Sequence, residues 1–212
     1  MKGGAQNGAS PVKGAVNVDN SPSVFLGHHK IICAVLSSLG LLSEKNKKFI
    51  SIVREHNIIQ GNAQALPFSE GSVDVLYTCH MAEHLYEEEF IKFLAEAERV
   101  LKPGGILRIA VPDLAVLVNT YNQDGDADEF CKSLHLSHYP KISGLQWLNL
   151  LVFGDRSKHK WGYAARSMTR FIEEHTNLKV TELKAGETTI NFPTGINYRE
   201  REEESLYVEC VK

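Results

Sequence analysis

GNAQALPFSEGSVDVLYTCHMAEHL, residues 61–85, and EAERVLKPGGILRIAVPDL, residues 96–114, are the stretches that decide the fold of this chain. Val73–Thr78 is a short apolar run between turn residues, which predicts a buried strand. Tyr86–Leu101 repeats apolar side chains every three or four positions, which predicts an amphipathic helix that ends at the sequence KPGG. Ile106–Val111 predicts the next strand. Because a helix joins these strands, we expect them to be parallel neighbours.

The same alternation of short strands and helices continues on both sides of this block. We predict further strands at Ala15–Val18, Ile58–Ile59, Lys179–Lys184 and Ser205–Val211, and helices at 21–39, 43–55, 114–121, 145–153 and 165–175, with an acidic loop at Asp124–Glu129. This order predicts a three-layer α/β fold with a mainly parallel sheet. The last two strands are expected to form an antiparallel hairpin at its edge.

The composition is that of an ordinary globular protein. The chain has 212 residues, of which 43% are hydrophobic and 23% charged, so we expect a single domain over residues 1–212. The net charge of -3 gives no general attraction to nucleic acid or to anionic lipid, and neither is expected as a partner. Ile31–Leu42 is the most apolar stretch, but a membrane span needs roughly 20 residues. It predicts a buried helix instead.

The cysteine spacing and the N-terminal sequence indicate the cellular compartment in which the protein is expected. Cys33, Cys79, Cys131 and Cys210 lie far apart without a CxxC pair, so the sequence indicates neither a zinc ribbon nor a disulfide scaffold. The opening KGGAQNGAS lacks the apolar core of a secretory signal. We therefore expect a cytoplasmic protein. The oligomeric state stays open, a homodimer included.

Four positions satisfy the rule that ligands of a parallel sheet bind beyond the carboxyl ends of its strands. They are the glycine-rich opening with Gly3 and Gly4, Asp19 after the first predicted strand, the turn Gly61–Ala63, and the run from Cys79 to His84. Carboxylate, amide and imidazole groups gather at these positions. The sequence therefore predicts a ligand site at this edge.

The block LPF...SVDV...EHL...RVLKPGG resembles the central part of class I S-adenosylmethionine-dependent methyltransferases, and the similarity extends over about residues 14–180. VNVDNSPS (16–23) and FGDRSKHKWGY (153–163) are more narrowly similar to bacterial, type 11-like members associated with polysaccharide biosynthesis genes. The resemblance implies a Rossmann-like fold. It also implies S-adenosylmethionine as methyl donor, S-adenosylhomocysteine as product, and a small-molecule or carbohydrate acceptor.

The resemblance further implies which residues meet the cofactor. Asp19 would accept hydrogen bonds from the ribose hydroxyls, and a carboxylate suits that role because charge-assisted bonds are strong. Asn62 and Ala63 would lie at the adenine, and Gly3 and Gly4 would form the glycine-rich loop. Only Met1 and Lys2 precede that loop, so the first strand would be truncated. The competing interpretation of Asp19 is a turn or helix cap before the following serine.

The resemblance places three residues beside the transferred methyl group: His80, Glu83 and His84. His80 would also touch the cofactor. Histidine suits the removal of an acceptor proton because its pKa is near neutrality, and Glu83 would orient the base or the acceptor. The structural alternative is that Glu83 and His84 brace the next helix while His80 only packs. An irregular cap at about 124–164 would cover the site.

Within and beside that cap, three polar or aromatic residues are candidates for binding the acceptor: Asp113, His159 and Trp161.

Two other functions remain open. The clipped first strand is compatible with a degenerate cofactor-binding or scaffold protein without transfer activity. The letters HMAEH at 80–84 also match HxxEH, a zinc hydrolase motif in which both histidines lie on one helix face. That motif must lie inside a helix, whereas this one follows a predicted strand. We therefore expect no metal site.

Overall fold

The computed structural model describes residues 11, 14–56, 58–135, 158–190 and 196–212. Its strands are β1 (Val18–Asp19), β2 (Ile59–Gln60), β3 (Val73–Cys79), β4 (Leu101–Pro112), β5 (Lys179–Leu183) and β6 (Ser205–Val211). Its helices are α1 (Pro22–His28), α2 (Lys30–Ser38), α3 (Glu44–His56), α4 (Glu87–Val100), α5 (Leu114–Asp124), α6 (Ala127–Ser133) and α8 (Ala165–His175), with a short 3₁₀ helix at Ala82–His84.

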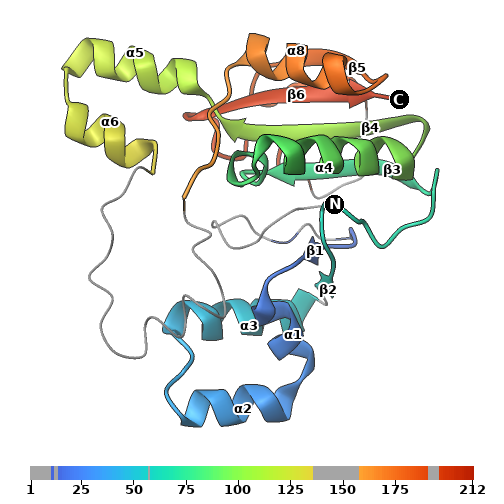
Figure 1. Cartoon of the computed structure of the whole chain (residues 1–212), viewed down its shortest axis with the longest axis vertical. Helices are drawn as coiled ribbons and strands as arrows, with labels where there is room; N and C mark the ends of the chain where they lie inside the picture. Colours follow the sequence, from blue (N-terminus) through green and yellow to red (C-terminus); the bar gives the residue numbers. More distant parts are fainter. Residues whose placement is uncertain (1–10, 12–13, 57, 136–157, 191–195) are drawn as a thin grey trace.

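The strands form two sheets (Figure 1). The larger has the order β3-β4-β6-β5, in which β3 and β4 are parallel and β6 is antiparallel to both of its neighbours. The smaller is the parallel pair β1-β2. The parallel β3-α4-β4 unit and the antiparallel pair β5-β6 are therefore confirmed, and the arrangement is that of a Rossmann-like α/β fold.

Helices α4 and α8 cover one face of the four-stranded sheet, and both lie on the same side of it in Figure 1. The α4 side chains Phe90, Phe93 and Leu94 are buried with Met168 and Ile172 of α8. Apolar residues at three- and four-residue spacing form one stripe on each helix, and burial of such a stripe stabilises the pairing of helix and sheet.

Strand β4 begins earlier than the sequence predicts, because the KPGG segment itself is part of the strand. Gly104 adopts a φ of 77°, which is accessible to glycine with little strain. A Cβ atom on Gly105 would lie 2.8 Å from the carbonyl oxygen of Lys102, so a side chain cannot fit there without a backbone shift. The two glycines thus let the chain pass directly from α4 into β4.

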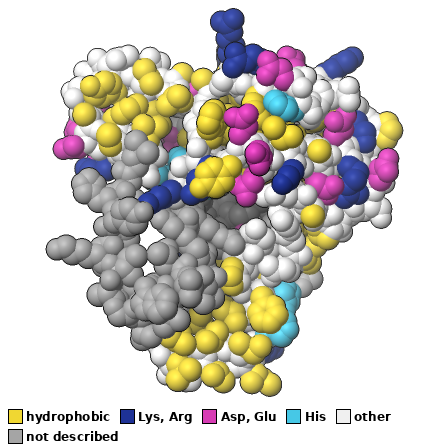
Figure 2. All heavy atoms as spheres, in the orientation of Figure 1, with side chains coloured by type: hydrophobic (Ala, Val, Ile, Leu, Met, Phe, Trp, Pro, Cys, Tyr) yellow, Lys and Arg dark blue, Asp and Glu magenta, His cyan; other side chains and the backbone are white. Residues whose placement is uncertain are grey.

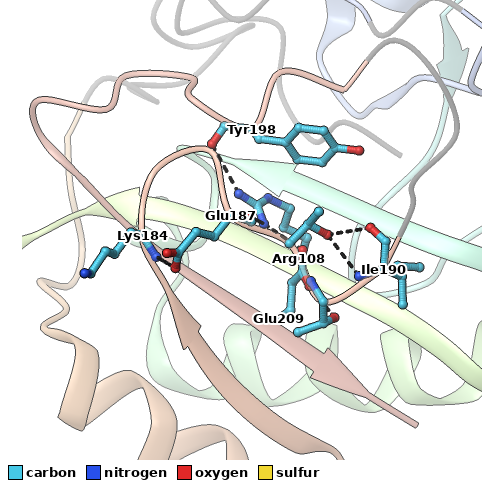
Figure 3. Close-up of polar contacts among 8 residues, drawn as sticks. Arg108, Lys184, Glu187, Ile190, Tyr198 and Glu209 are labelled. Carbon is cyan, nitrogen blue, oxygen red and sulfur yellow. Dashed lines mark hydrogen bonds and ion pairs between the residues drawn. The ribbon is translucent and has the colours of Figure 1, made fainter.

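A buried ion pair lies on the other face of this sheet, under the irregular segments 184–190 and 196–200 (Figure 3). Arg108 of β4 donates to the Glu209 carboxylate of β6 at 2.6 Å, and neither side chain is exposed. Arg108 also donates to the carbonyl oxygens of Glu187 at 3.0 Å and Tyr198 at 3.2 Å, and Thr189 N donates to Glu209 at 2.7 Å. Polar contacts therefore hold these segments on the sheet.

The predicted single helix over 21–39 is two helices. Helix α1 begins at Pro22, as the sequence predicts, but ends at His28, and α2 starts after His29. The His29 backbone has φ -113° and ψ 77°, which is not helical. The chain therefore bends between the two apolar runs.

The prediction that Ile31–Leu42 forms a buried helix is wrong for most of its length. Ile31 is 82% exposed, Val35 52% and Leu39 61%, whereas Cys33 is buried. Hydrophobic side chains gather at the end of the molecule where α2 lies (Figure 2). The apolar run is helical, but only one side of that helix packs against other described residues.

The remaining predictions have mixed outcomes. Part of the expected acidic loop is helix α6, because Asp126 caps it by accepting a hydrogen bond from Glu129 N at 2.9 Å. The helix predicted at 145–153 and the structural use of residues 1–6 lie outside the described residues. The single domain with a cap at 124–164 stays a prediction. Among the residues that the structure describes, no helix is long and apolar enough to cross a bilayer.

Candidate functional site

His80 leaves the end of β3 in a left-handed conformation, with a φ of 48°, and is buried. Arg201 Nη1 donates to His80 Nδ1 at 3.0 Å, and since guanidinium only donates, the ring proton belongs on Nε2. Nε2 then donates to Ser205 Oγ at 2.8 Å. Burial first, and then the Arg201 charge, lowers the pKa of His80 to about 3. Its predicted role as base stays a prediction and would require the Arg201 bond to break.

Glu83, in the short 3₁₀ helix that follows, is a buried carboxyl group. Neither carboxyl oxygen has a hydrogen-bond partner among the described residues. Its Oε1 atom lies 3.6 Å from His80 Nδ1 and 3.7 Å from His84 Nε2. Burial raises the pKa of Glu83 to about 8. The backbone oxygen of Glu83 accepts hydrogen bonds from Lys160 N at 2.7 Å and Trp161 N at 3.2 Å.

These backbone bonds bring the segment 158–161 against the 3₁₀ helix. The ring of His159 packs edge-on against His84, with centroids 5.0 Å apart, and against His135, at 4.3 Å. Burial lowers the pKa of His84, and burial together with the neighbouring His135 lowers that of His159 to about 4. The structure thus joins the predicted catalytic run to His159, a predicted acceptor residue.

The other two candidates for binding the acceptor, Asp113 and Trp161, lie near the segment 158–161 or within it. Their side chains are in different environments. Asp113 is the N-cap of α5, where its Oδ1 accepts from Ala115 N at 2.9 Å. It also forms a backbone bridge with Tyr163, next to the segment 158–161. The Trp161 side chain is half exposed. Asp113 thus serves as a helix cap, and Trp161 is accessible.

Sequence reasoning missed the groups that hold His80, which come from the chain just before and at the start of β6. Arg201 donates to His80 and also to Glu204 at 3.1 Å, and Ser205 accepts from His80. His80, His135 and Arg201 are the non-glycine residues of the described part that have positive φ. Such strained conformations concentrate at functional sites, so this group marks the site independently of any motif.

The predicted cofactor residues lie at the parallel pair β1-β2. Asp19 ends β1 and is buried, and its Oδ1 accepts from Ser21 N at 2.6 Å, as the turn interpretation predicts. Asn62 follows β2 and is exposed, with its Oδ1 accepting from Gln64 N at 3.0 Å. Ala63 packs against the main core. The register places Asp19 opposite Gln60, so both strand ends meet at one edge.

Two further predictions concern this site. Gly3 and Gly4 lie outside the described residues. The HxxEH letters do not lie on one α-helix, because His80 follows β3 and only residues 82–84 are helical, in a 3₁₀ turn. His80 and His84 therefore lack the shared helix face that the zinc hydrolase motif requires.

The comparisons with known proteins point to one class of enzyme. Residues 27–109, less than half of the chain, match the profile of a family described as a methyltransferase domain. A protein of Mycolicibacterium smegmatis, named a probable S-adenosylmethionine-dependent methyltransferase, is 37% identical over 57 residues, which is 27% of this chain and 21% of that protein.

A Mycobacterium ulcerans protein, named phthiotriol/phenolphthiotriol dimycocerosates methyltransferase 1, is 44% identical over 59 residues, 26% of this chain and 21% of its own length. The chain thus spans about a fifth of these curated relatives. A structure of an S-adenosylmethionine-dependent methyltransferase from Archaeoglobus fulgidus is similar with 15% identity and a TM-score of 0.44, over 95% of this chain and 88% of that one. The family match and the relatives' names support a methyltransferase.

Proposed function

We propose that this protein transfers a methyl group from S-adenosylmethionine to a small-molecule or carbohydrate acceptor. The observation that carries the proposal is the methyltransferase-domain match over residues 27–109, which includes β3, α4 and the His80–His84 run. The acceptor preference rests on the resemblance of residues 153–163 to polysaccharide-associated family members. A cytoplasmic location and the cap at 124–164 belong to the same proposal.

Asp19 fits the ribose end of such a cofactor. It is a buried carboxylate whose second oxygen, Oδ2, has no partner among the described residues, and a ribose hydroxyl can donate to it. Asn62 would meet the adenine amino group through the remaining acceptor capacity of its side-chain oxygen. The cofactor supplies an activated methyl group when bound. These residues would fix its sugar and base.

The acceptor would bind at the ends of β3 and β4. In-line displacement requires above all that the acceptor atom be aligned with the methyl group. His80, Glu83 and His84 would orient the acceptor from the β3 side, with His159 and Trp161 on the facing segment. The hydrogen bonds from His80 to Ser205 and from Arg201 to His80 would keep this side of the site rigid.

Calorimetric titration with S-adenosylhomocysteine tests the cofactor part of the proposal. We expect micromolar binding by the wild type, and a loss of about ten- to a hundredfold for Asp19→Ala, because a charge-assisted hydrogen bond contributes about 1.5–3 kcal/mol. Asp74→Ala, at an exposed carboxylate of β3, is the matched control and should bind normally. No binding by the wild type at millimolar ligand would instead support the degenerate scaffold.

A further inference from the structure

The buried carboxyl group of Glu83 lacks the partners that such a group normally has. Its side chain is 2% exposed, and both oxygens are without hydrogen bonds among the described residues. An unpaired polar group in this environment costs free energy, so buried carboxylates are normally hydrogen-bonded, paired or bound to a metal ion. The groups around Glu83 show which of these solutions fits.

His84 presents a lone pair to Glu83. Its Nδ1 atom lies 3.0 Å from the carbonyl oxygen of Lys158, and because a carbonyl only accepts, Nδ1 carries the proton. Nε2 is then unprotonated and lies 3.7 Å from Glu83 Oε1. This separation is longer than a hydrogen bond. A histidine that donates one ring N–H to a backbone carbonyl while its other nitrogen binds a metal is the usual arrangement in metal sites.

His159 supplies a third donor from a distant part of the sequence. One ligand atom each from Glu83, His84 and His159 can be chosen so that all lie within 4.8 Å of one another. The position of His159 is fixed by the hydrogen bond of the adjacent Lys160 N to Glu83 O. His135 packs edge-on against its ring. The three donors are thus held together by the fold.

We propose that Glu83, His84 and His159 bind a divalent transition-metal ion, with zinc as the preferred ion. One carboxylate oxygen and two imidazole nitrogens are a donor set that zinc accepts, with zinc–ligand bonds of about 2.0–2.2 Å. The donor atoms, which lie within 4.8 Å of one another, would move closer together on binding. Three protein ligands leave a coordination position for water or for an oxygen of a ligand. The site goes beyond the proposed methyl transfer and does not depend on it.

The proposed site differs from the HxxEH motif because His80 is not one of its ligands. Both ring nitrogens of His80 are engaged, by Arg201 and by Ser205. The positive charge of Arg201 near the donors is offset by its ion pair with Glu204 at 3.1 Å. Because a carboxylate must be deprotonated to bind a metal ion, Glu83 would release any proton that it carries when the ion binds.

Zinc titration of the full chain tests the proposal. The protein is prepared without a polyhistidine tag, treated with a chelator and desalted, and then titrated with Zn²⁺ by calorimetry and with Co²⁺ by visible absorption. We expect one equivalent of each ion, and Co²⁺ bands typical of a tetrahedral site. His159→Ala and Glu83→Gln should weaken binding at least about tenfold. Glu83→Gln preserves side-chain volume, and circular dichroism verifies that both variants fold.

Two control variants make the result decisive. His175→Ala removes an exposed histidine of α8 and should bind Zn²⁺ as the wild type does. His80→Gln should also retain binding, whereas a loss there with normal binding by His159→Ala would support the HxxEH ligand set and overturn the proposal. Absence of stoichiometric binding by the wild type would overturn it as well. S-adenosylhomocysteine titration of the same samples reports on the methyltransferase proposal separately.

Discussion

The hydrogen bond from Arg201 to His80 joins residues that are 121 positions apart. The sequence identifies His80 as a candidate because it follows a predicted strand, and the structure places it there. The sequence does not predict its chemical state. Burial and the guanidinium charge move the pKa of His80 to about 3, far from the near-neutral value that suggested a base. Arg201 belongs to no motif, so no sequence pattern could have paired the two residues.

The Arg108–Glu209 pair gives the first stability prediction at the level of single residues. Glu209→Ala leaves a buried guanidinium without its carboxylate, and we expect the free energy of unfolding to fall by about 3–5 kcal/mol. Urea denaturation measures it. Glu174→Ala, which removes one partner of an exposed pair with Arg170, should change it by less than about 1 kcal/mol.

A double variant checks the cause of this effect. Arg108→Met with Glu209→Leu removes both charges, and should be more stable than Glu209→Ala alone because no unpaired charge stays buried. Equal losses for Glu209→Ala and Glu174→Ala would show that the ion pair contributes no more than a surface contact.

At the level of elements, α2 and α8 show what apolar periodicity can predict. Both helices form where the sequence predicts helical structure, and the bounds of α8 agree with the prediction to the residue. Periodicity identifies the apolar face of a helix but not whether another element covers it. Ile172 of α8 is fully buried, whereas Ile31 of α2 is 82% exposed. The sequence predicted the range of α8 without predicting its burial, whereas the burial predicted for Ile31–Leu42 was wrong.

The same substitution in these two helices provides a matched comparison. Ile172→Ala should lower the free energy of unfolding by about 2–5 kcal/mol, because it leaves a cavity in the core. Ile31→Ala should leave it nearly unchanged or raise it slightly, since the side chain is exposed and alanine favours helix. Thermal and urea unfolding measure both. A large loss for Ile31→Ala would mean that its side chain is covered in solution.

At the level of the whole molecule, the local order of elements was predictable, and the long-range contacts of the site were not. The β3-α4-β4 unit follows from periodicity and crossover rules, and the β5-β6 pair follows from alternation. The contact of segment 158–161 with Glu83 depends on backbone hydrogen bonds across the fold, which no residue pattern encodes. Asp19 and Asn62 lie at the predicted strand ends. The Oδ1 atom of each accepts a hydrogen bond from a backbone N–H two residues later, within a local turn.

The distribution of thiols gives a prediction for the whole fold. Cys131 on α6 is exposed, whereas Cys33, Cys79 and Cys210 are buried, and burial raises the pKa of Cys210 to about 12. Because the thiolate is the reactive form, iodoacetamide should label Cys131 first under native conditions, and the other three only after unfolding. Mass spectrometry identifies the labelled sites, and Cys131→Ser should remove the fast label. Rapid native labelling of Cys210 would contradict the core described above.

The position of β6 between β4 and β5 has a consequence for biosynthesis. Arg108 emerges from the ribosome 101 residues before Glu209. During that interval β4 lacks its neighbour β6 at one edge, and the Arg108 guanidinium lacks the Glu209 carboxylate. Nascent chains with unpaired edges are prone to associate with one another. Until β6 has been translated, the newly made polypeptide therefore exposes the edge of β4 that β6 later covers.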